Sequence, residues 1–164
     1  MAPLTTRKQI AGLAVWLIVS FIAAAIGSAA TIQAGPFYTQ LLRPDWAPPP
    51  TIFGPVWTVL YILMGIAAWL VWRLGGFRAA RSALTLFLAQ LALNALWSWL
   101  FFGWHRGALA FADIILLLAI LAATVVAFAR IRRAAAWLLA PYIVWVCFAT
   151  ALCFSVWQRN PTQL

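Results

Sequence analysis

The sequence contains very few acidic residues, and this shortage excludes several classes of protein. Among 164 residues there are only two carboxylate side chains, Asp45 and Asp113, and charged residues make up 8% of the chain. Soluble globular domains carry about 25% charged residues, and disordered chains have low hydrophobicity. An ordinary soluble domain and a disordered chain are therefore both excluded. The net charge of +9 reflects missing acids rather than abundant bases.

Cysteine and histidine are also scarce. The chain has two cysteines and one histidine. On a helix, Cys147 and Cys153 would lie about 9 Å apart along the axis, which is too far for a disulfide. The lone His105 belongs to no cluster of zinc ligands and to no credible Ser-His-Asp triad. The sequence therefore predicts no metal site, no required cofactor and no catalytic residue.

The basic residues are too scattered for a nucleic-acid surface. They occur singly or in twos and threes between long apolar runs, whereas nucleic-acid-binding domains gather basic residues on one face. We therefore expect no nucleic-acid partner.

Apolar residues dominate the rest of the chain, at 66%, and 11 residues are tryptophan. Five long apolar runs cover about residues 10–32, 52–72, 83–104, 107–128 and 134–157. Each is long enough to cross a bilayer, which needs about 20 apolar residues. Within lipid the backbone must satisfy its own hydrogen bonds, so these runs are predicted to be helices. The expected fold is an all-α bundle of five transmembrane helices in a single domain, residues 1–164.

The connection between the first two runs, residues 33–51, is long and rich in proline. Its prolines fix φ and remove hydrogen-bond donors, which predicts a semi-rigid extended loop without helix. Loops of this length in a compact domain are usually functional. The aromatic side chains of this loop favour an ordered lid over the bundle, with a plain connector as the alternative.

The distribution of lysine and arginine predicts the orientation in the membrane. One side carries Arg7, Lys8, Arg73, Arg78, Arg81, Arg130, Arg132 and Arg133, and the other carries Arg43, Arg106 and Arg159. Positively charged loops stay in the cytoplasm. The N-terminus is therefore expected in the cytoplasm and the lid loop outside, as in a protein of the bacterial inner membrane.

Three of the predicted helices carry an aromatic stripe. Residues spaced by about four share a helix face, and this spacing joins Phe53, Trp57 and Tyr61 in the second run. It also joins Gln90, Asn94 and Trp97 in the third run, and Tyr142, Trp145 and Ala149 in the fifth. Two interpretations remain open. The stripes could wall a ligand pocket, or the tryptophans could form interfacial belts, as expected for Trp16, Trp46, Trp72, Trp104, Trp137 and Trp157.

Polar groups inside the apolar runs favour the pocket. Uncharged amides within a bilayer need partners, so Gln90 and Asn94 are predicted to face the bundle interior. Asp113 is the only acid inside an apolar run, and intramembrane acids are frequently functional. Its place near the start of the fourth run also suits a structural role at the helix terminus.

Three ordered strings carry a resemblance to a known family. They are WAPPPTIFGPVWTVLYILMG from Trp46, QLALNALWSWLFFG from Gln90, and PYIVWVCFATAL from Pro141, followed by VWQRN from Val156. The chain resembles the TspO/MBR family of tryptophan-rich sensory and translocator proteins over about residues 36–160. It departs from the family pattern at Cys153, where asparagine is common.

The resemblance implies a homodimeric membrane receptor that binds porphyrins and other hydrophobic molecules in an aromatic pocket beneath the lid. The implied ligand-binding residues are Trp46, Phe53, Trp57, Tyr61, Asn94, Trp97, Trp145 and Ala149. Arg43, Gln90 and Asp113 are secondary candidates, and Arg43 is placed to pair with a porphyrin propionate. The implied role is a receptor or sensor in tetrapyrrole regulation or stress signalling.

Two other functions fit the same sequence. A light- and oxygen-dependent porphyrin-degrading enzyme would draw its chemistry from the photoexcited ligand, because the chain offers no metal site. A transporter of porphyrins, sterols or other metabolites would be expected to show internal repeats, and the chain shows none.

Overall fold

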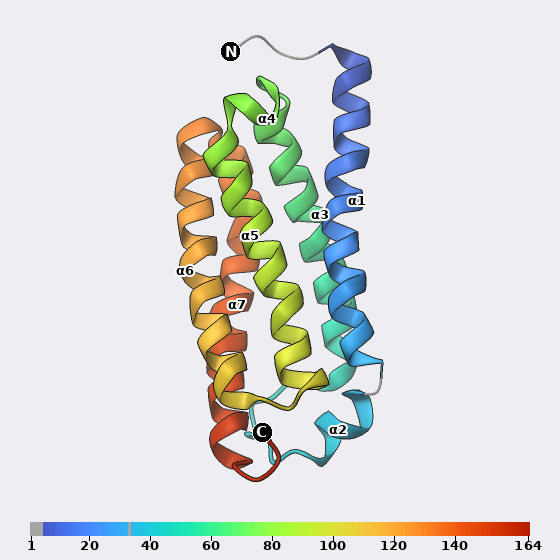
Figure 1. The fold of residues 1–164 in the computed structure, drawn as a ribbon, viewed down its shortest axis with the longest axis vertical. Helices are drawn as coiled ribbons and strands as arrows, with labels where there is room; N and C mark the ends of the chain where they lie inside the picture. Colours follow the sequence, from blue (N-terminus) through green and yellow to red (C-terminus); the bar gives the residue numbers. More distant parts are fainter. Residues whose placement is uncertain (1–4, 33) are drawn as a thin grey trace.

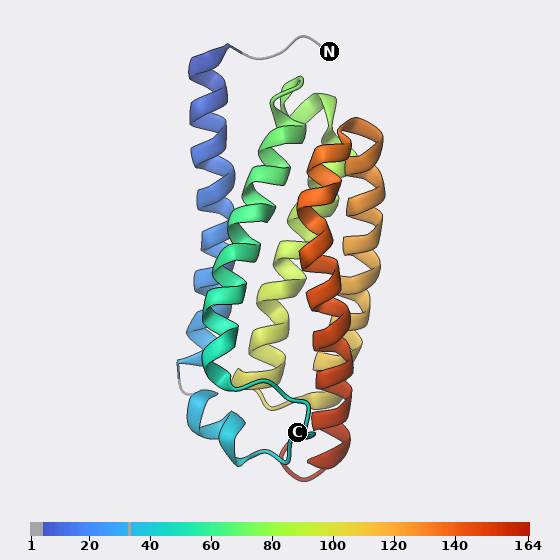
Figure 2. The same cartoon turned by 180° about the vertical axis from the view of Figure 1, so that it is seen from behind.

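The protein is a bundle of long helices, seen here in a computed structural model that describes residues 5–32 and 34–164 (Figures 1 and 2). No strand occurs within these described ranges. The long helices are α1 (Thr6–Thr31), α3 (Phe53–Trp72), α5 (Arg81–Ser98), α6 (Gly107–Ile131) and α7 (Arg133–Arg159). Two short helices, α2 (Ala34–Gln40) and α4 (Gly76–Ala79), lie at opposite ends of the bundle.

The long helices match the thickness of a bilayer. Within the described residues, five helical spans of 23 to 27 residues are long and apolar enough to cross a membrane. At about 1.5 Å per residue they reach roughly 35–40 Å, which exceeds the hydrocarbon core of about 30 Å. The prediction of an all-α bundle with five transmembrane helices is confirmed, and the chain is an integral membrane protein.

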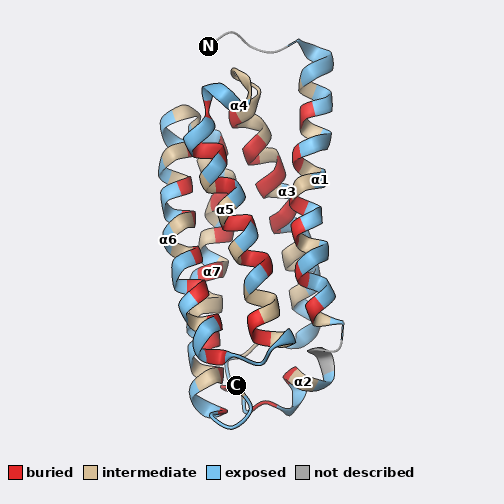
Figure 3. Ribbon diagram, viewed as in Figure 1, coloured by how far each residue is buried: buried red, intermediate tan, exposed pale blue. Residues whose placement is uncertain are grey.

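The five helices pack as a closed ring. Helix α1 contacts α3 and α5, α3 contacts α7, α7 contacts α6, and α6 contacts α5. Buried residues line the inward faces, whereas the outer faces are exposed and remain apolar (Figure 3). Apolar outer faces are expected because lipid is the solvent there. Bulky residues fill the middle of the ring, including Met64, Phe87 and Phe128, which are fully buried.

Glycine sets how closely α1 approaches α3. A Cβ on Gly65 would lie 3.1 Å from the Leu17 Cα and 3.2 Å from the Trp16 carbonyl oxygen, both backbone atoms of α1. Small residues permit such contacts between membrane helices. The indole N–H of Trp69 also donates to the Gln9 carbonyl over 2.8 Å. Helices α1 and α3 are therefore joined tightly in the half of the bundle that contains the N-terminus.

The connections between helices use a few special backbone conformations. Gly76 has φ +77° at the start of α4, and His105 has φ +53° between α5 and α6. Both lie in the left-handed region, where glycine is favoured. Helix α5 continues into a wider π-helical segment, η2 (Trp99–Gly103). The N–H of the next residue, Trp104, donates to the Trp99 carbonyl. Such segments often occur near functional sites.

The prediction that residues 33–51 form an extended loop without helix is wrong in part. Residues 34–40 form α2, and Pro50–Ile52 form a 3₁₀ turn, η1, that leads into α3. Pro36 lies in the first turn of α2, where a proline removes no intrahelical hydrogen bond. Residues 41–49 form the non-helical part of the connection, and Gln33 lies outside the described residues.

One tryptophan assigned to the interfacial belts is instead in the core. Trp16 is buried, and its ring packs edge-on against Phe87 with centroids 5.7 Å apart. Trp104 and Trp137 are exposed, as a belt requires. The sequence could not separate these cases, because each tryptophan lies within or beside an apolar run.

Candidate ligand-binding cavity

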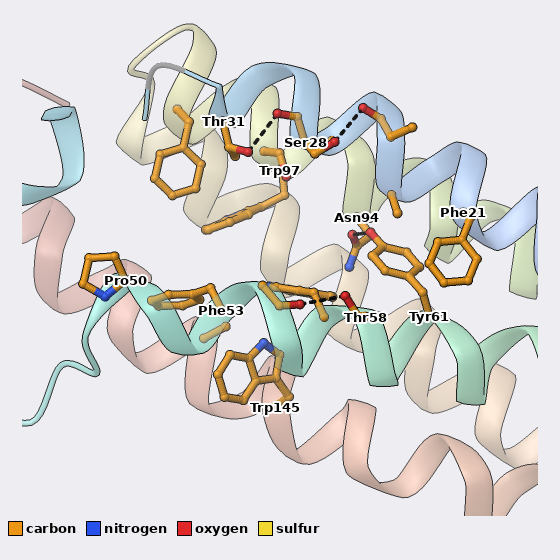
Figure 4. Close-up of a pocket in the computed structure, with 18 of the residues that line it drawn as sticks. Phe21, Ser28, Thr31, Pro50, Phe53, Thr58, Tyr61, Asn94, Trp97 and Trp145 are labelled. Carbon is orange, nitrogen blue, oxygen red and sulfur yellow. Dashed lines mark hydrogen bonds between the residues drawn. The ribbon is translucent and has the colours of Figure 1, made fainter. Parts of the chain in front are cut away.

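A cavity of about 660 Å³ lies at the α2 end of the bundle, between α1, α3, α5 and α7 (Figure 4). Its volume falls within the usual range for small-molecule sites, about 300–1,000 Å³. Eight of its lining residues are aromatic, namely Phe21, Tyr38, Phe53, Trp57, Tyr61, Trp97, Phe102 and Trp145. The cavity therefore suits a hydrophobic ligand with flat aromatic surfaces.

A chain of polar side chains crosses the bundle at the deep end of the cavity. The Tyr61 hydroxyl on α3 donates to Asn94 Oδ1 on α5 over 2.6 Å. Asn94 Nδ2 donates to the Tyr142 hydroxyl on α7 over 2.8 Å. All three side chains are buried, so their hydrogen bonds satisfy polar groups that lipid could not. The chain ties three helices together and fixes the Asn94 amide at the cavity wall.

Packed rings hold the cavity wall in place. Trp145 meets Phe53 and Trp57 edge-on, with centroids 5.9 and 6.5 Å apart. Trp57 in turn contacts Tyr61 and Tyr142 at 5.7 and 6.0 Å. Such pairs each contribute about 0.5–1.5 kcal/mol beyond area burial. The wall is thus preorganised, and a ligand would meet rings that are already positioned.

Most of the residues implied by the family resemblance lie together at this cavity. The lining includes Phe53, Trp57, Tyr61, Asn94, Trp97, Trp145 and Ala149. They come from α3, α5 and α7, as the spacing of the aromatic stripes predicted. Their contact with a ligand stays a prediction.

Trp46 and Arg43 lie apart from the lining. Trp46 is 51% exposed and packs edge-on against Phe148. The Arg43 guanidinium lies 5.1 Å from the centre of the Tyr38 ring. Arg43 borders a separate groove formed by the loop before α3, whereas the Tyr38 ring that it covers lines the cavity.

Gln90 and Asp113 also lie outside the cavity lining. Gln90 is fully buried, with its Nε2 atom 3.8 Å from the sulfur of Met64. Asp113 is 7% exposed, and its Oδ2 atom has no hydrogen-bond partner among the described residues. An acid can cap a helix only at its start. Because α6 begins at Gly107, Asp113 lies beyond the first turn and does not cap the helix.

A lid, formed by α2 and residues 41–49, covers the α2 end of the cavity and is held in place by other parts of the chain. Tyr38 on α2 is buried against Phe53. Burial raises the pKa of its hydroxyl above the ordinary value of 10, and the nearby charge of Arg43 opposes this shift. The side chain of Asn160 accepts from the Leu42 N–H at 2.9 Å and donates to the Leu42 carbonyl at 3.0 Å. The lid is therefore docked on the C-terminal end of α7.

The sequence reasoning missed one whole wall of the cavity. Helix α1 contributes Phe21, Ala24, Gly27 and Ser28. Ala24, Gly27 and Ser28 are small, and small residues also let membrane helices pack closely. Gly27 does pack closely, since a Cβ there would lie 3.1 Å from the Ser98 hydroxyl oxygen. The same small side chains leave room for the cavity, and only the position of α1 against α5 reveals this second role.

The histidine, cysteine and acidic side chains lie apart from one another in the part of the chain that the structure describes. Residues 5–32 and 34–164 contain no group of three or more histidine, cysteine, aspartate or glutamate side chains that could hold an ion. Cys153 is buried and Cys147 is exposed, and both are free thiols.

Comparison with known proteins finds relatives that match most of the chain. The chain is 40% identical to the tryptophan-rich protein TspO of Chlorobaculum tepidum over 157 residues, covering 94% of this chain and 99% of that protein. It is 43% identical to the human translocator protein over 126 residues, covering 76% and 75% of the two chains. It is 37% identical to the tryptophan-rich sensory protein of Cereibacter sphaeroides, covering 88% and 92%. A family model matches residues 13–158, and the chain belongs to the TspO/MBR family.

Proposed function

We propose that this protein is a membrane receptor or sensor that binds porphyrin-type tetrapyrroles and other hydrophobic ligands in the cavity between α1, α3, α5 and α7. The observation that carries the proposal is the cavity itself, which combines a volume of about 660 Å³ with eight aromatic side chains in its wall. A flat conjugated ligand stacks favourably on such rings. Ligand binding to this receptor would serve tetrapyrrole regulation or stress signalling.

A titration with protoporphyrin IX tests this proposal. Quenching of tryptophan emission reports binding in the wild type, Trp57→Phe and Trp145→Phe, and Trp137→Phe serves as the matched control. Trp137 is 76% exposed on α7 and lies outside the cavity lining. If the lost ring contacts are worth about 0.5–1.5 kcal/mol, each cavity variant weakens affinity by roughly twofold to tenfold. Equal affinities in all four proteins would contradict the assignment of the cavity.

Arg43 is proposed to pair with a propionate of a ligand that extends past Tyr38. Its guanidinium already lies over the Tyr38 ring, and Tyr38 lines the cavity. The Arg43→Ala variant is expected to bind protoporphyrin more weakly at low salt, since exposed charge pairs are screened as salt rises. The dimethyl ester, which lacks both carboxylates, is the matched ligand and should bind both proteins equally. Unchanged affinity for the free acid would exclude this role.

The membrane setting of the proposal follows from the charge distribution. Eight basic residues lie at the ends of helices or in connections on the side of the N-terminus, and three lie on the lid side. We infer a bacterial inner-membrane protein with a cytoplasmic N-terminus and an outward-facing lid. We further propose a homodimer, whose exposed apolar helix faces would supply the interface. Labelling of an engineered exposed thiol by an impermeant reagent tests the orientation.

A further inference from the structure

The cavity has an opening on the side of the bundle, between α1 and α3. Several of its lining residues are exposed on the protein surface, namely Phe21, Ala25 and Ser28 on α1 and Gly54 and Thr58 on α3. We call these five residues the portal. Apart from its chain neighbours and the backbone of its own helix, a Cβ built on Gly54 would meet no described atom within 4 Å, so no other helix fills the α3 side of the portal at this position.

The portal extends to membrane depth. Phe21 lies ten residues before the end of α1, and Thr58 lies five residues after the start of α3. These separations correspond to about 15 Å and 8 Å along the helix axes. Figure 4 shows Phe21 and Tyr61 at one end of the cavity and Pro50 at the other. The opening therefore runs from the lid toward the middle of the bilayer, where hydrocarbon surrounds it.

The rim of the portal is chemically suited to apolar molecules. Its two hydroxyl groups bond within their own helices, Ser28 to the Ala25 carbonyl at 3.0 Å and Thr58 to the Gly54 carbonyl at 2.9 Å. These bonds do not bridge α1 and α3. A ligand that passes between the helices thus breaks neither of them and leaves no hydroxyl unpaired in lipid.

The lid, by contrast, is fastened. Its release would break the two hydrogen bonds between Asn160 and Leu42. It would also separate the rings of Phe37 and His105, which are stacked with centroids 4.0 Å apart. Entry through the lid therefore carries a cost that entry through the portal does not.

We propose that hydrophobic ligands enter and leave the cavity from the hydrocarbon of the bilayer, through the portal between α1 and α3, while the lid stays docked. The inference rests on the proposed function for the identity of the ligand. An apolar ligand partitions into the bilayer, so the membrane supplies it directly to this opening.

Labelling of a thiol inside the cavity tests the route without a porphyrin. The reporter is Ala149→Cys, at a lining position, in a Cys147→Ala background that removes the exposed native thiol. The background protein without the reporter gives the blank for the buried Cys153. The protein is reconstituted in phosphatidylcholine vesicles, and N-phenylmaleimide, a lipid-soluble reagent, is added.

The portal is then blocked with tryptophan. Ser28→Trp is compared with Ala29→Trp, and Thr58→Trp with Val59→Trp. Ala29 and Val59 are exposed neighbours that do not line the cavity. A bulky ring in the opening raises the entry barrier, so the labelling rate of each portal variant is expected to fall by about tenfold or more. Each control variant is expected to label at the rate of its parent. The two portal variants are independent, and helical circular dichroism identifies any variant that has not folded.

A variant with a released lid tests the alternative route, entry through the lid. Asn160→Ala removes both bonds to Leu42, and its labelling rate is expected to stay within about twofold of the parent. The proposal is overturned if the folded portal variants label at the parental rate, or if Asn160→Ala accelerates labelling by about fivefold or more. Protoporphyrin titration of the parent reports the proposed function separately, because maleimide access needs no porphyrin binding.

Discussion

Removal of the Asn94 amide is expected to destabilise the bundle by a predictable amount. Asn94→Ala eliminates the bond from Tyr61 at 2.6 Å and the bond to Tyr142 at 2.8 Å. Side-chain hydrogen bonds between membrane helices contribute about 0.6 kcal/mol on average and about 1.7 kcal/mol at most. The loss of two such bonds should lower the free energy of unfolding by about 1–3.5 kcal/mol.

Double-mutant cycles separate the hydrogen bonds from the loss of packing. Asn94→Ala is combined with Tyr61→Phe in one cycle and with Tyr142→Phe in another, and equilibrium unfolding in mixed micelles gives the free energies. Each cycle is expected to show a coupling of about 0.6 kcal/mol. Tyr38→Phe is the matched control, because Tyr38 is a buried tyrosine with no hydrogen bond to Asn94, and its coupling should be near zero.

The hydrogen bonds of Asn94 would be refuted if both tyrosine cycles showed the same coupling as the Tyr38 control. That result would mean that Asn94 does not bond to Tyr61 and Tyr142 in the folded protein. The polar chain would then not tie α3, α5 and α7 together at the deep end of the cavity. A large effect of Asn94→Ala with no coupling would instead indicate lost packing.

Three further predictions concern Gly65 with Gly54 as its control, Asn160, and Tyr38. Gly65→Ala should lower the thermal midpoint in detergent, because its Cβ meets the backbone of α1 and overpacking costs about 1–3 kcal/mol. Gly54→Ala is the matched control and should change the midpoint less than Gly65→Ala does, because its Cβ meets no atom of another described helix within 4 Å; the opposite order would refute the packing of α1 on α3. Asn160→Ala should speed amide exchange at Leu42 by about fivefold or more through loss of its hydrogen bonds, and unchanged exchange would show that the lid is held elsewhere. Burial raises the pKa of Tyr38, so the stability contributed by its neutral hydroxyl is complete below pH 10 and is lost as the pH rises through the raised pKa. The ultraviolet titration of the wild type minus that of Tyr38→Phe should show one tyrosinate that forms above pH 10, and a difference that titrates at or below pH 10 would disprove the assignment.

The helices were predictable because lipid imposes a simple rule. A run of about 20 apolar residues must be a helix in a bilayer, whatever its neighbours are. The fourth run was expected at about 107–128 and the helix spans Gly107–Ile131. The structure of the connection after the first run was harder to predict, because every proline was taken as evidence against a helix, whatever its position. Pro36 falls where a helix tolerates it, and α2 forms around it.

The three aromatic stripes were predictable for a similar reason. A spacing of about four residues places side chains on one helix face regardless of context, and Trp57, Asn94 and Trp145 do meet at one cavity. Trp46 lies in the connection before α3, where no periodicity fixes the direction of a side chain, and it lies against Phe148 instead. Phe21 and Ser28 were missed, because a small or apolar residue on α1 carries no sign of which neighbour it faces.

The sequence by itself determined the solvent, the number of spanning helices and the composition of each helix face. These follow from hydrophobicity and helix period, which are local properties of the chain. Only the tertiary structure decided that α1 closes the ring, that Asn94 bonds to Tyr61 and Tyr142, and that Asn160 fastens the lid. It also decided where the cavity opens. The physical reason is that these features depend on which faces meet, and a pattern within one helix does not specify its partner.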